Sequence, residues 1–162
     1  MDNLEKNIRD QLATVLEGRL GHITFTKAAE GFQPDLRAAR VENLDHNAWE
    51  LVYHMHAAQR DILEFIRNPD YTSPDFPKGY WPKNEADPTE ERWYEIIDAF
   101  HEDMETLKRM VRDPGEDLYT PFPHGTGQNL FREALTLGNH NSYHIGQFVD
   151  LRMLLEVPVK DW

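Results

Sequence analysis

Hydrophobic residues recur along this chain at intervals of three and four, the spacing that places side chains on one face of an α-helix. These stripes predict four long helices, at about residues 3–17, 45–67, 88–111 and 126–155. We find no convincing strand pattern and no internal repeat in the sequence. The pattern therefore predicts an all-α protein, a four-helix bundle that forms a single domain over residues 1–162.

Residues near the ends of the stripes indicate where the helices begin and end. Asp45 is a suitable N-cap for the second helix, because its carboxylate can accept a hydrogen bond from a free N–H group of the first turn. Pro69 ends that helix, since the residue before a proline is pushed out of the α region. The acidic residues 90–91 suit the positive end of the third helix. The fourth helix is expected to begin near Thr126 or Gly127.

Three long connections separate the helices. The first, residues 18–45, is expected to be a loop with one or two short helical turns, which Phe25 and Phe32 anchor to the core. The second, residues 69–87, is rich in proline and aromatic residues, and the third covers residues 114–127. Loops of this length are usually functional or pack over other parts of a protein. We therefore regard the second and third loops as candidate walls of a pocket.

The composition narrows the range of partners. The chain of 162 residues carries 17 Lys and Arg against 29 Asp and Glu, a formal net charge of −12. Such a charge repels phosphate backbones and anionic lipids, which argues against nucleic acid and membrane surfaces as partners. No apolar run reaches the length of about 18 residues that a transmembrane helix needs. A small molecule is the expected partner.

Cysteine is absent from the sequence. Disulfides, thiolate metal ligands and cysteine nucleophiles are therefore excluded, and any metal ion must be held by His, Asp or Glu. The N-terminal segment is charged and amphipathic and lacks the apolar core of a signal peptide. Together these features lead us to expect a cytoplasmic protein.

The strongest chemical feature is the pair His140 and His144 in the fourth helix. A spacing of four brings both imidazoles to one helix face, one turn apart, so that one ion can take a nitrogen from each. His144 falls near the middle of the apolar stripe and His140 at its edge, beside the inward-pointing Asn141. Such buried polar groups need partners, since an unpaired one costs on the order of 1–3 kcal/mol. The alternative is a pair of core histidines bonded to backbone or carboxylate groups.

A third ligand must come from another helix. His54 and His56 of the second helix are candidates, but they differ by about 200° around the helix axis and flank its apolar stripe on opposite sides. Helix geometry alone does not choose between them. Of the other histidines, His46 is interpreted as a helix-start residue. His124 is a loop residue that either lies over the end of the bundle or is solvated.

Two polar residues of the fourth helix are candidate catalytic groups. Glu133 lies seven residues before His140, on the same side of the helix, and is the best carboxylate for accepting a proton. Its alternative interpretation is a boundary residue paired with Arg or Lys. Gln147 follows His144 by three residues and could orient a ligand or a water molecule.

Several segments of the chain resemble the DinB-like (YfiT-like) family of metal-dependent proteins. The resemblance covers about residues 25–155, and its most specific pieces are WELxxH at residues 49–54 and HNxYHxGQ at residues 140–147. The loop NPDYTSPDFPKGYWP and the segment DLYTPFPHGTGQNLFREAL also resemble the family. The chain departs from the family's pattern at Asn139, where an acidic residue is common, and at His56, where a basic residue is common.

The resemblance implies a four-helix bundle with a metal site at one end of its interior. The family's three ligands map onto His54, His140 and His144, which selects His54 rather than His56 by resemblance. Family members with assigned activities include thiol-dependent transferases and isomerases. A homodimer is also implied.

Three imidazoles that leave one position free are typical of a catalytic rather than a structural metal site. Imidazole suits zinc or nickel, and zinc lowers the pKa of a water at the free position toward about 7. We expect either a hydrolase that activates water or a transferase that activates an external low-molecular-weight thiol. The alternative is a non-catalytic metal-binding or stress-response protein. The residues expected to line the substrate pocket are Tyr80, Trp81, Phe122 and His124.

Overall fold

The computed structural model describes residues 3–83 and 88–159, and this part of the chain is all-helical. It contains five α-helices and two short 3₁₀ helices, and no strand. The α-helices are α1 (Asn3–Leu16), α2 (Phe25–Ala29), α3 (Ala48–Arg67), α4 (Glu90–Arg112) and α5 (Leu130–Leu154). The 3₁₀ helices are η1 (Pro34–Leu36) and η2 (Lys78–Tyr80). The prediction of an all-α protein is confirmed.

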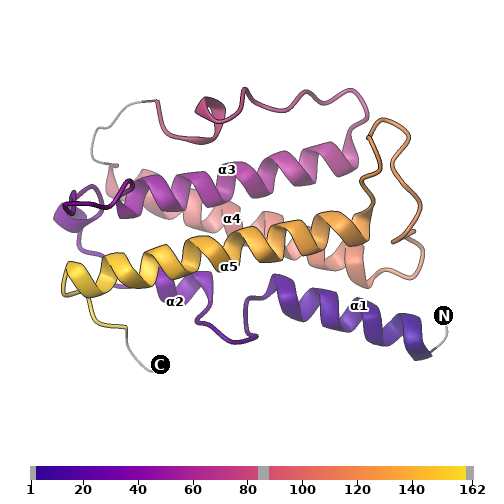
Figure 1. Ribbon diagram of the computed structural model, residues 1–162, viewed down its shortest axis with the longest axis horizontal. Coiled ribbons are helices and arrows are strands. Elements are labelled where there is room, and N and C mark those ends of the chain that lie inside the picture. Colours follow the sequence, from indigo (N-terminus) through magenta and orange to yellow (C-terminus); the bar gives the residue numbers. More distant parts are fainter. Residues whose placement is uncertain (1–2, 84–87, 160–162) are drawn as a thin grey trace.

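The four long helices pack around one apolar core (Figure 1). α3 lies beside α4 and α5, and α1 packs against the same two helices on the side away from α3. The core is built from the predicted stripes, for example Leu51 and Met55 of α3 and Leu137 and Phe148 of α5. Each such side chain contributes roughly 1.5–3 kcal/mol when it is fully buried. None of the described helices combines the length and apolar character needed to span a bilayer.

α3 begins at Ala48, two or three residues after the predicted start at Asp45 or His46, because its N-cap is Asn47 and not Asp45. The Asn47 side chain accepts a hydrogen bond from the Glu50 N–H at 2.9 Å, and the Glu50 carboxylate accepts one from the Asn47 N–H at 3.1 Å. This reciprocal capping box satisfies two N–H groups that the helix leaves free. The prediction of Asp45 as the cap is therefore wrong.

α5 also begins later than predicted. Its N-cap is Asn129, whose side chain accepts a hydrogen bond from the Arg132 N–H at 2.8 Å. Residues 126–127, where the helix was expected to begin, belong to the preceding loop. The Asn129 amide also donates to the Tyr119 carbonyl at 2.8 Å, which ties the start of α5 to that loop.

The first connection contains α2 and η1, as the expectation of short helical turns implied. Phe25 and Phe32 are buried, with 5% and 4% of their surface exposed. Phe25 stacks on Phe100 of α4, and Phe32 lies edge-on to Phe148 of α5. Their predicted role as anchors of the loop is confirmed.

The described part of the second connection, residues 69–83, runs along α3 (Figure 1). Its 3₁₀ helix, η2, contacts α3 directly. The connection therefore brings the aromatic residues Tyr80 and Trp81 onto the helix that carries His54.

Candidate metal centre

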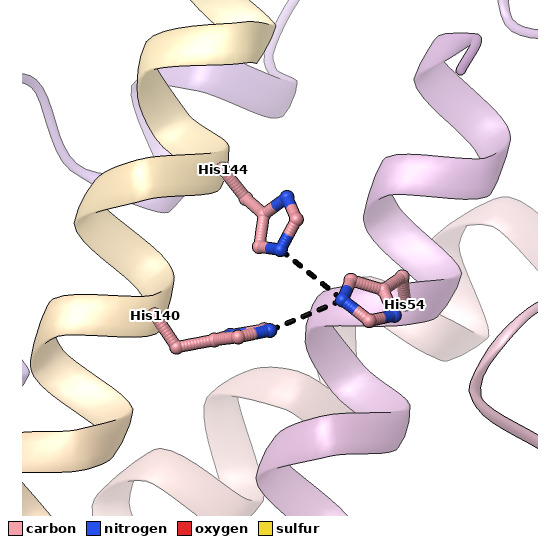
Figure 2. A group of neighbouring side chains, drawn as sticks. All are labelled: His54, His140 and His144. Atoms are coloured by element: carbon pink, nitrogen blue, oxygen red, sulfur yellow. Dashed lines mark hydrogen bonds between the residues drawn. The ribbon is translucent and has the colours of Figure 1, made fainter. Parts of the chain in front are cut away.

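Three imidazoles meet between α3 and α5 (Figure 2). The Nε2 atom of His54 lies 3.1 Å from Nε2 of His144 and 3.1 Å from Nε2 of His140. One ligand atom from each residue lies within 4.8 Å of the other two, so the group could hold a metal ion. Helix geometry alone does not choose between His54 and His56. The structure brings His54 to the pair on α5, whereas His56 Nε2 lies 3.5 Å from Asp103 Oδ2 of α4.

The packing of the two helices explains why the rings converge. His54 is 9% exposed and His144 6% exposed, because each lies on the core-facing side of its helix. His140 lies one turn before His144 on α5 and is partly buried. The side-by-side packing of α3 and α5 then points all three rings into the same space.

The second ring nitrogen of His54 is held by the loop above it. His54 Nδ1 lies 3.2 Å from the Tyr80 carbonyl oxygen. A carbonyl oxygen only accepts hydrogen bonds, so the proton of the neutral ring is on Nδ1 and Nε2 carries a free lone pair. This is the tautomer that ligates a metal ion through Nε2.

His144 is held in the same way by its own helix. Its Nδ1–H donates to the Gln147 amide oxygen at 2.7 Å, which leaves Nε2 without a proton. The Gln147 NH₂ group in turn donates to the Tyr143 hydroxyl at 3.4 Å. The corresponding contact of His140 is weaker, since its Nδ1 lies 3.5 Å from the Asn141 amide oxygen.

The hydrogen bonds at Nδ1 of His54 and His144 leave the three Nε2 atoms with more lone pairs than protons. His140 Nε2 can carry a proton and donate it to His54 Nε2, but His144 Nε2 has none to share with the same atom. Two bare nitrogens therefore face each other at 3.1 Å. A cation resolves this arrangement, and a tetrahedral zinc site with bonds of about 2.1 Å places its ligand nitrogens roughly 3.4 Å apart. The two distances from His54 lie close to this spacing, and the three donor atoms all lie within 4.8 Å of one another.

The electrostatic environment keeps the rings neutral. Burial lowers the pKa of His54 to about 4, and the neighbouring His144 and His140 add to the effect. Burial likewise lowers the pKa of His144 to about 4, with His140 adding to it. The pKa of His140 is also lowered, chiefly by burial. At neutral pH all three rings are therefore in the uncharged form that binds metals.

Trp81 covers one face of the site. Its ring stacks on His54 with centroids 4.0 Å apart and planes 5° apart. The other side of the stack is His46, whose ring lies 3.8 Å from that of Trp81. Two of the predicted pocket residues, Tyr80 and Trp81, thus lie at the site. The role of His46 was missed, because nothing in its local sequence indicates a stack on a residue 35 positions away.

The other two predicted pocket residues are not part of this centre. Phe122 and His124 pack on Phe65 near the opposite end of α3, and His124 Nε2 donates to the Phe65 carbonyl at 2.8 Å. Phe65 is eleven residues beyond His54, roughly 16 Å along the helix axis. The structure therefore does not place Phe122 or His124 beside the three histidines, since the loop that carries them closes the far end of α3.

Glu133 is buried, with 7% of its surface exposed, but it lies two turns before His140, roughly 10 Å along α5. Burial raises the pKa of its carboxyl group, and the charge of Asp61 on α3 adds to the effect. Among the described residues Glu133 forms no ion pair with Arg or Lys, and the charge of the neighbouring Arg132 only partly offsets the rise in its pKa. Its role as a proton acceptor stays a prediction.

Several cavities border α5. One of about 110 Å³ is lined by His46 and by Gln147, the residue that accepts a hydrogen bond from His144. Another, of about 180 Å³, lies between α1, α2, α4 and α5 and is bordered by Asn141, His22 and His101. Asn141 is buried as predicted, and among the described residues its side chain makes one hydrogen bond, the long contact with His140.

We compared the chain with known protein families, with curated proteins and with solved structures, and none of the three comparisons gave a match.

Proposed function

We propose that this protein is a metal-dependent enzyme in which His54, His140 and His144 hold one divalent ion and leave a position free for a water molecule or a small thiol. The convergence of three Nε2 atoms, two of them deprotonated by bonds at Nδ1, carries the proposal. The same residues carry the resemblance to the DinB-like family. The packing of four long helices around one core is consistent with that family's four-helix bundle.

The chemistry of the donor set supports zinc or nickel. All three donors are neutral imidazole nitrogens, and the sequence offers no thiolate. When bound, such an ion lowers the pKa of a water or thiol at its free position and so supplies a nucleophile near neutral pH. A thiol cosubstrate must come from outside the chain, because the protein has no cysteine.

The residues around the histidines have definable tasks. The Tyr80 carbonyl and the Gln147 amide oxygen keep protons on the Nδ1 atoms and away from Nε2. Trp81 shields one face of His54 from water. Gln147, which holds His144, also lines a cavity of about 110 Å³, and this is the space we propose for a small substrate. A cytoplasmic location, a homodimer and a small-molecule substrate stay predictions of the sequence.

The proposal is tested by metal content and turnover measured together. Protein purified without a histidine tag should contain one zinc or nickel ion per chain by elemental analysis. It should also hydrolyse an activated ester such as p-nitrophenyl acetate, or couple glutathione to an electrophile such as monochlorobimane. The variant His144→Ala should lose both the ion and the activity, whereas His124→Ala, a histidine outside the centre, should keep both.

Two results would contradict the proposal. Protein that takes up no ion, even when zinc or nickel is added, removes its basis. Protein that binds one ion but turns over neither class of substrate favours the second candidate, a non-catalytic metal-binding or stress-response protein.

A further inference from the structure

Tyr80 contacts α3 at two points that lie two turns apart. Its carbonyl oxygen accepts a hydrogen bond from His54 Nδ1–H at 3.2 Å. Its hydroxyl group donates to Asp61 Oδ2 at 2.8 Å. His54 and Asp61 are seven residues apart on the same helix, roughly 10 Å along its axis. A single loop residue therefore bridges the ring at the candidate metal centre and a carboxylate outside it.

The hydrogen bond from the Tyr80 hydroxyl to Asp61 is stronger than one between two neutral groups. A hydroxyl donating to a carboxylate forms a charge-assisted hydrogen bond, about twice as strong as a neutral one. Burial raises the pKa of the Tyr80 hydroxyl, and its bond to Asp61 and the charge of Asp61 raise it further. The hydroxyl therefore stays protonated, and keeps donating, across the ordinary pH range.

The position of the Asp61 carboxylate reduces the stability of the folded protein. Its other oxygen, Oδ1, is buried and has no hydrogen-bond partner. An unsatisfied buried acceptor costs on the order of 1–3 kcal/mol. The buried carboxyl group of Glu133 lies near enough for the charge of Asp61 to raise its pKa. Packing alone would favour an apolar residue at this position. Two tyrosine hydroxyl groups account for the carboxylate: Tyr80 donates to Oδ2, and the pKa of Tyr71 is raised by burial, by the charge of Asp61 and by a hydrogen bond to it.

The loop around Tyr80 needs an anchor on α3 such as the hydrogen bond to Asp61. Tyr80 ends a 3₁₀ helix of three residues, which offers little stiffness of its own. The next residue, Trp81, lies flat on His54 and holds the face of the ring. Stacking does not fix the rotation of the ring in its own plane, whereas a hydrogen bond at Nδ1 does. The hydroxyl anchor therefore decides whether the Tyr80 carbonyl stays where His54 can reach it.

We propose that Asp61 is a positioning residue of the metal centre: through the Tyr80 hydroxyl it holds the Tyr80 carbonyl on His54 Nδ1, and so directs the Nε2 lone pair of His54 toward His140 and His144. This rests on the proposed function, because the ion is the reason for the direction. Asp61 touches neither the ion nor its ligands. It acts at a distance of two helical turns, through one side chain.

The test uses Tyr80→Phe, which removes the hydroxyl but keeps the carbonyl, and Asp61→Asn, which removes the charge. Each full-length variant is titrated with Co²⁺, and the visible absorption bands report both affinity and ligand geometry. Loss of an outer partner of a ligating histidine lowers metal affinity by roughly 10–100-fold. We expect that loss in both single variants, and no further loss in the double variant, because the two groups act through one bond.

Tyr119→Phe is the matched control. Tyr119 lies in the other long loop, is half exposed, and should keep the wild-type affinity and spectrum. Thermal unfolding of each metal-free variant separates positioning from general loss of stability. Variants that unfold at lower temperature but bind Co²⁺ as the wild type does would overturn the inference. Equal affinities in all variants would overturn it as well, while leaving the proposed function intact.

A second readout does not depend on the ion. The ¹⁵N chemical shifts of the His54 ring in metal-free protein report which nitrogen carries the proton. We expect Nδ1–H in the wild type and a mixture of tautomers in Tyr80→Phe. An unchanged tautomer in Tyr80→Phe would overturn the inference. Failure of the wild type to bind any ion would instead remove the proposed function, and the tautomer measurement would still show whether Asp61 and Tyr80 hold the ring.

Discussion

At the scale of single residues, a ligating histidine is defined by its second nitrogen as much as by its first. His54 and His144 use an oxygen acceptor at Nδ1, one from a loop backbone and one from a side chain on the same helix. Both bonds remove the proton from Nε2, the atom at which the rings meet. The acceptors are therefore part of the centre, although neither of them contacts an ion.

The role of Gln147 can be tested without changing the size of the side chain. Gln147→Met keeps the length but removes the amide oxygen that accepts from His144 Nδ1–H. We expect a loss of zinc affinity of roughly 10–100-fold, measured by isothermal titration calorimetry. Gln11→Met, at an exposed position of α1, is the control. Unchanged affinity in Gln147→Met would show that His144 does not depend on the amide.

Because the pKa of Glu133 is raised, we expect the stability of the protein to depend on pH. Burial raises the pKa of its carboxyl group above the ordinary 4.5, so the folded state holds the proton more tightly than the unfolded state. The protonated carboxyl group makes its full contribution to stability when the pH is below the pKa of Glu133 in the unfolded state. This contribution is lost as the pH rises through the pKa of Glu133 in the folded state. Glu133→Gln should therefore be more stable than the wild type at pH 8, with a smaller difference at pH 4.5. Urea unfolding at both values measures this, and a difference that grows toward acid pH would contradict it.

Single residues also show how far the sequence can lead. The pairing of His140 with His144 follows from helix geometry, so spacing was enough to predict it. The choice of His54 needed a resemblance, because His54 and His56 flank their stripe equally and only the packing of α3 on α5 separates them. His46 could not be found at all, since its partner Trp81 lies in a loop without periodicity.

At the scale of elements, the helices were predictable and their starts were not. Apolar periodicity spans many residues and tolerates errors, whereas a start depends on one side chain. Asp45 and Asn47 are both suitable caps by type. Asn47 is the cap because it forms the capping box with Glu50, and its amide also donates to the Ala38 carbonyl at 3.2 Å, a contact made across the first connection. That contact joins residues nine positions apart, and the spacing of hydrophobic residues does not predict it.

The N-cap of α3 gives a prediction that also tests whether Asn47, and not Asp45, is the cap. Asn47→Ala removes the side chain that accepts from the Glu50 N–H, and should lower the free energy of unfolding by about 0.5–2 kcal/mol. Asp45→Ala should change it little, because Asp45 lies outside the helix. Chemical denaturation of both variants measures the difference. A larger effect at Asp45 would restore the original interpretation of the helix start.

At the scale of the whole molecule, the candidate centre couples ion binding to folding. Only the folded chain brings the three imidazoles together, so an ion stabilises the folded state by mass action. At a free zinc concentration of 100 times Kd the gain is about 2.7 kcal/mol. For a domain of this size that corresponds to a rise in Tm of roughly 5–10 °C. A chelator should reverse the rise, and His144→Ala should abolish it. A rise that persists in His144→Ala would place the ion elsewhere.

The arrangement of the loops is the part of the whole molecule that the sequence did not reveal. Both the second and the third connections are aromatic and long, and both were predicted to wall the same pocket. One brings Trp81 onto His54, and the other closes the far end of α3 through His124. Loop paths are set by tertiary contacts and not by periodicity, so the two could be told apart only in the folded chain.

All three imidazoles belong to α3 and α5, and 86 residues separate His54 from His140. An ion on them would act as a reversible cross-link that closes just over half of the chain into a loop. The rate at which a chelator removes the ion can be compared with the rate at which amide hydrogens in the middle of both helices exchange with the solvent. Equal rates would show that release requires the two helices to separate, whereas faster loss of the ion would show that the chelator enters through the free position.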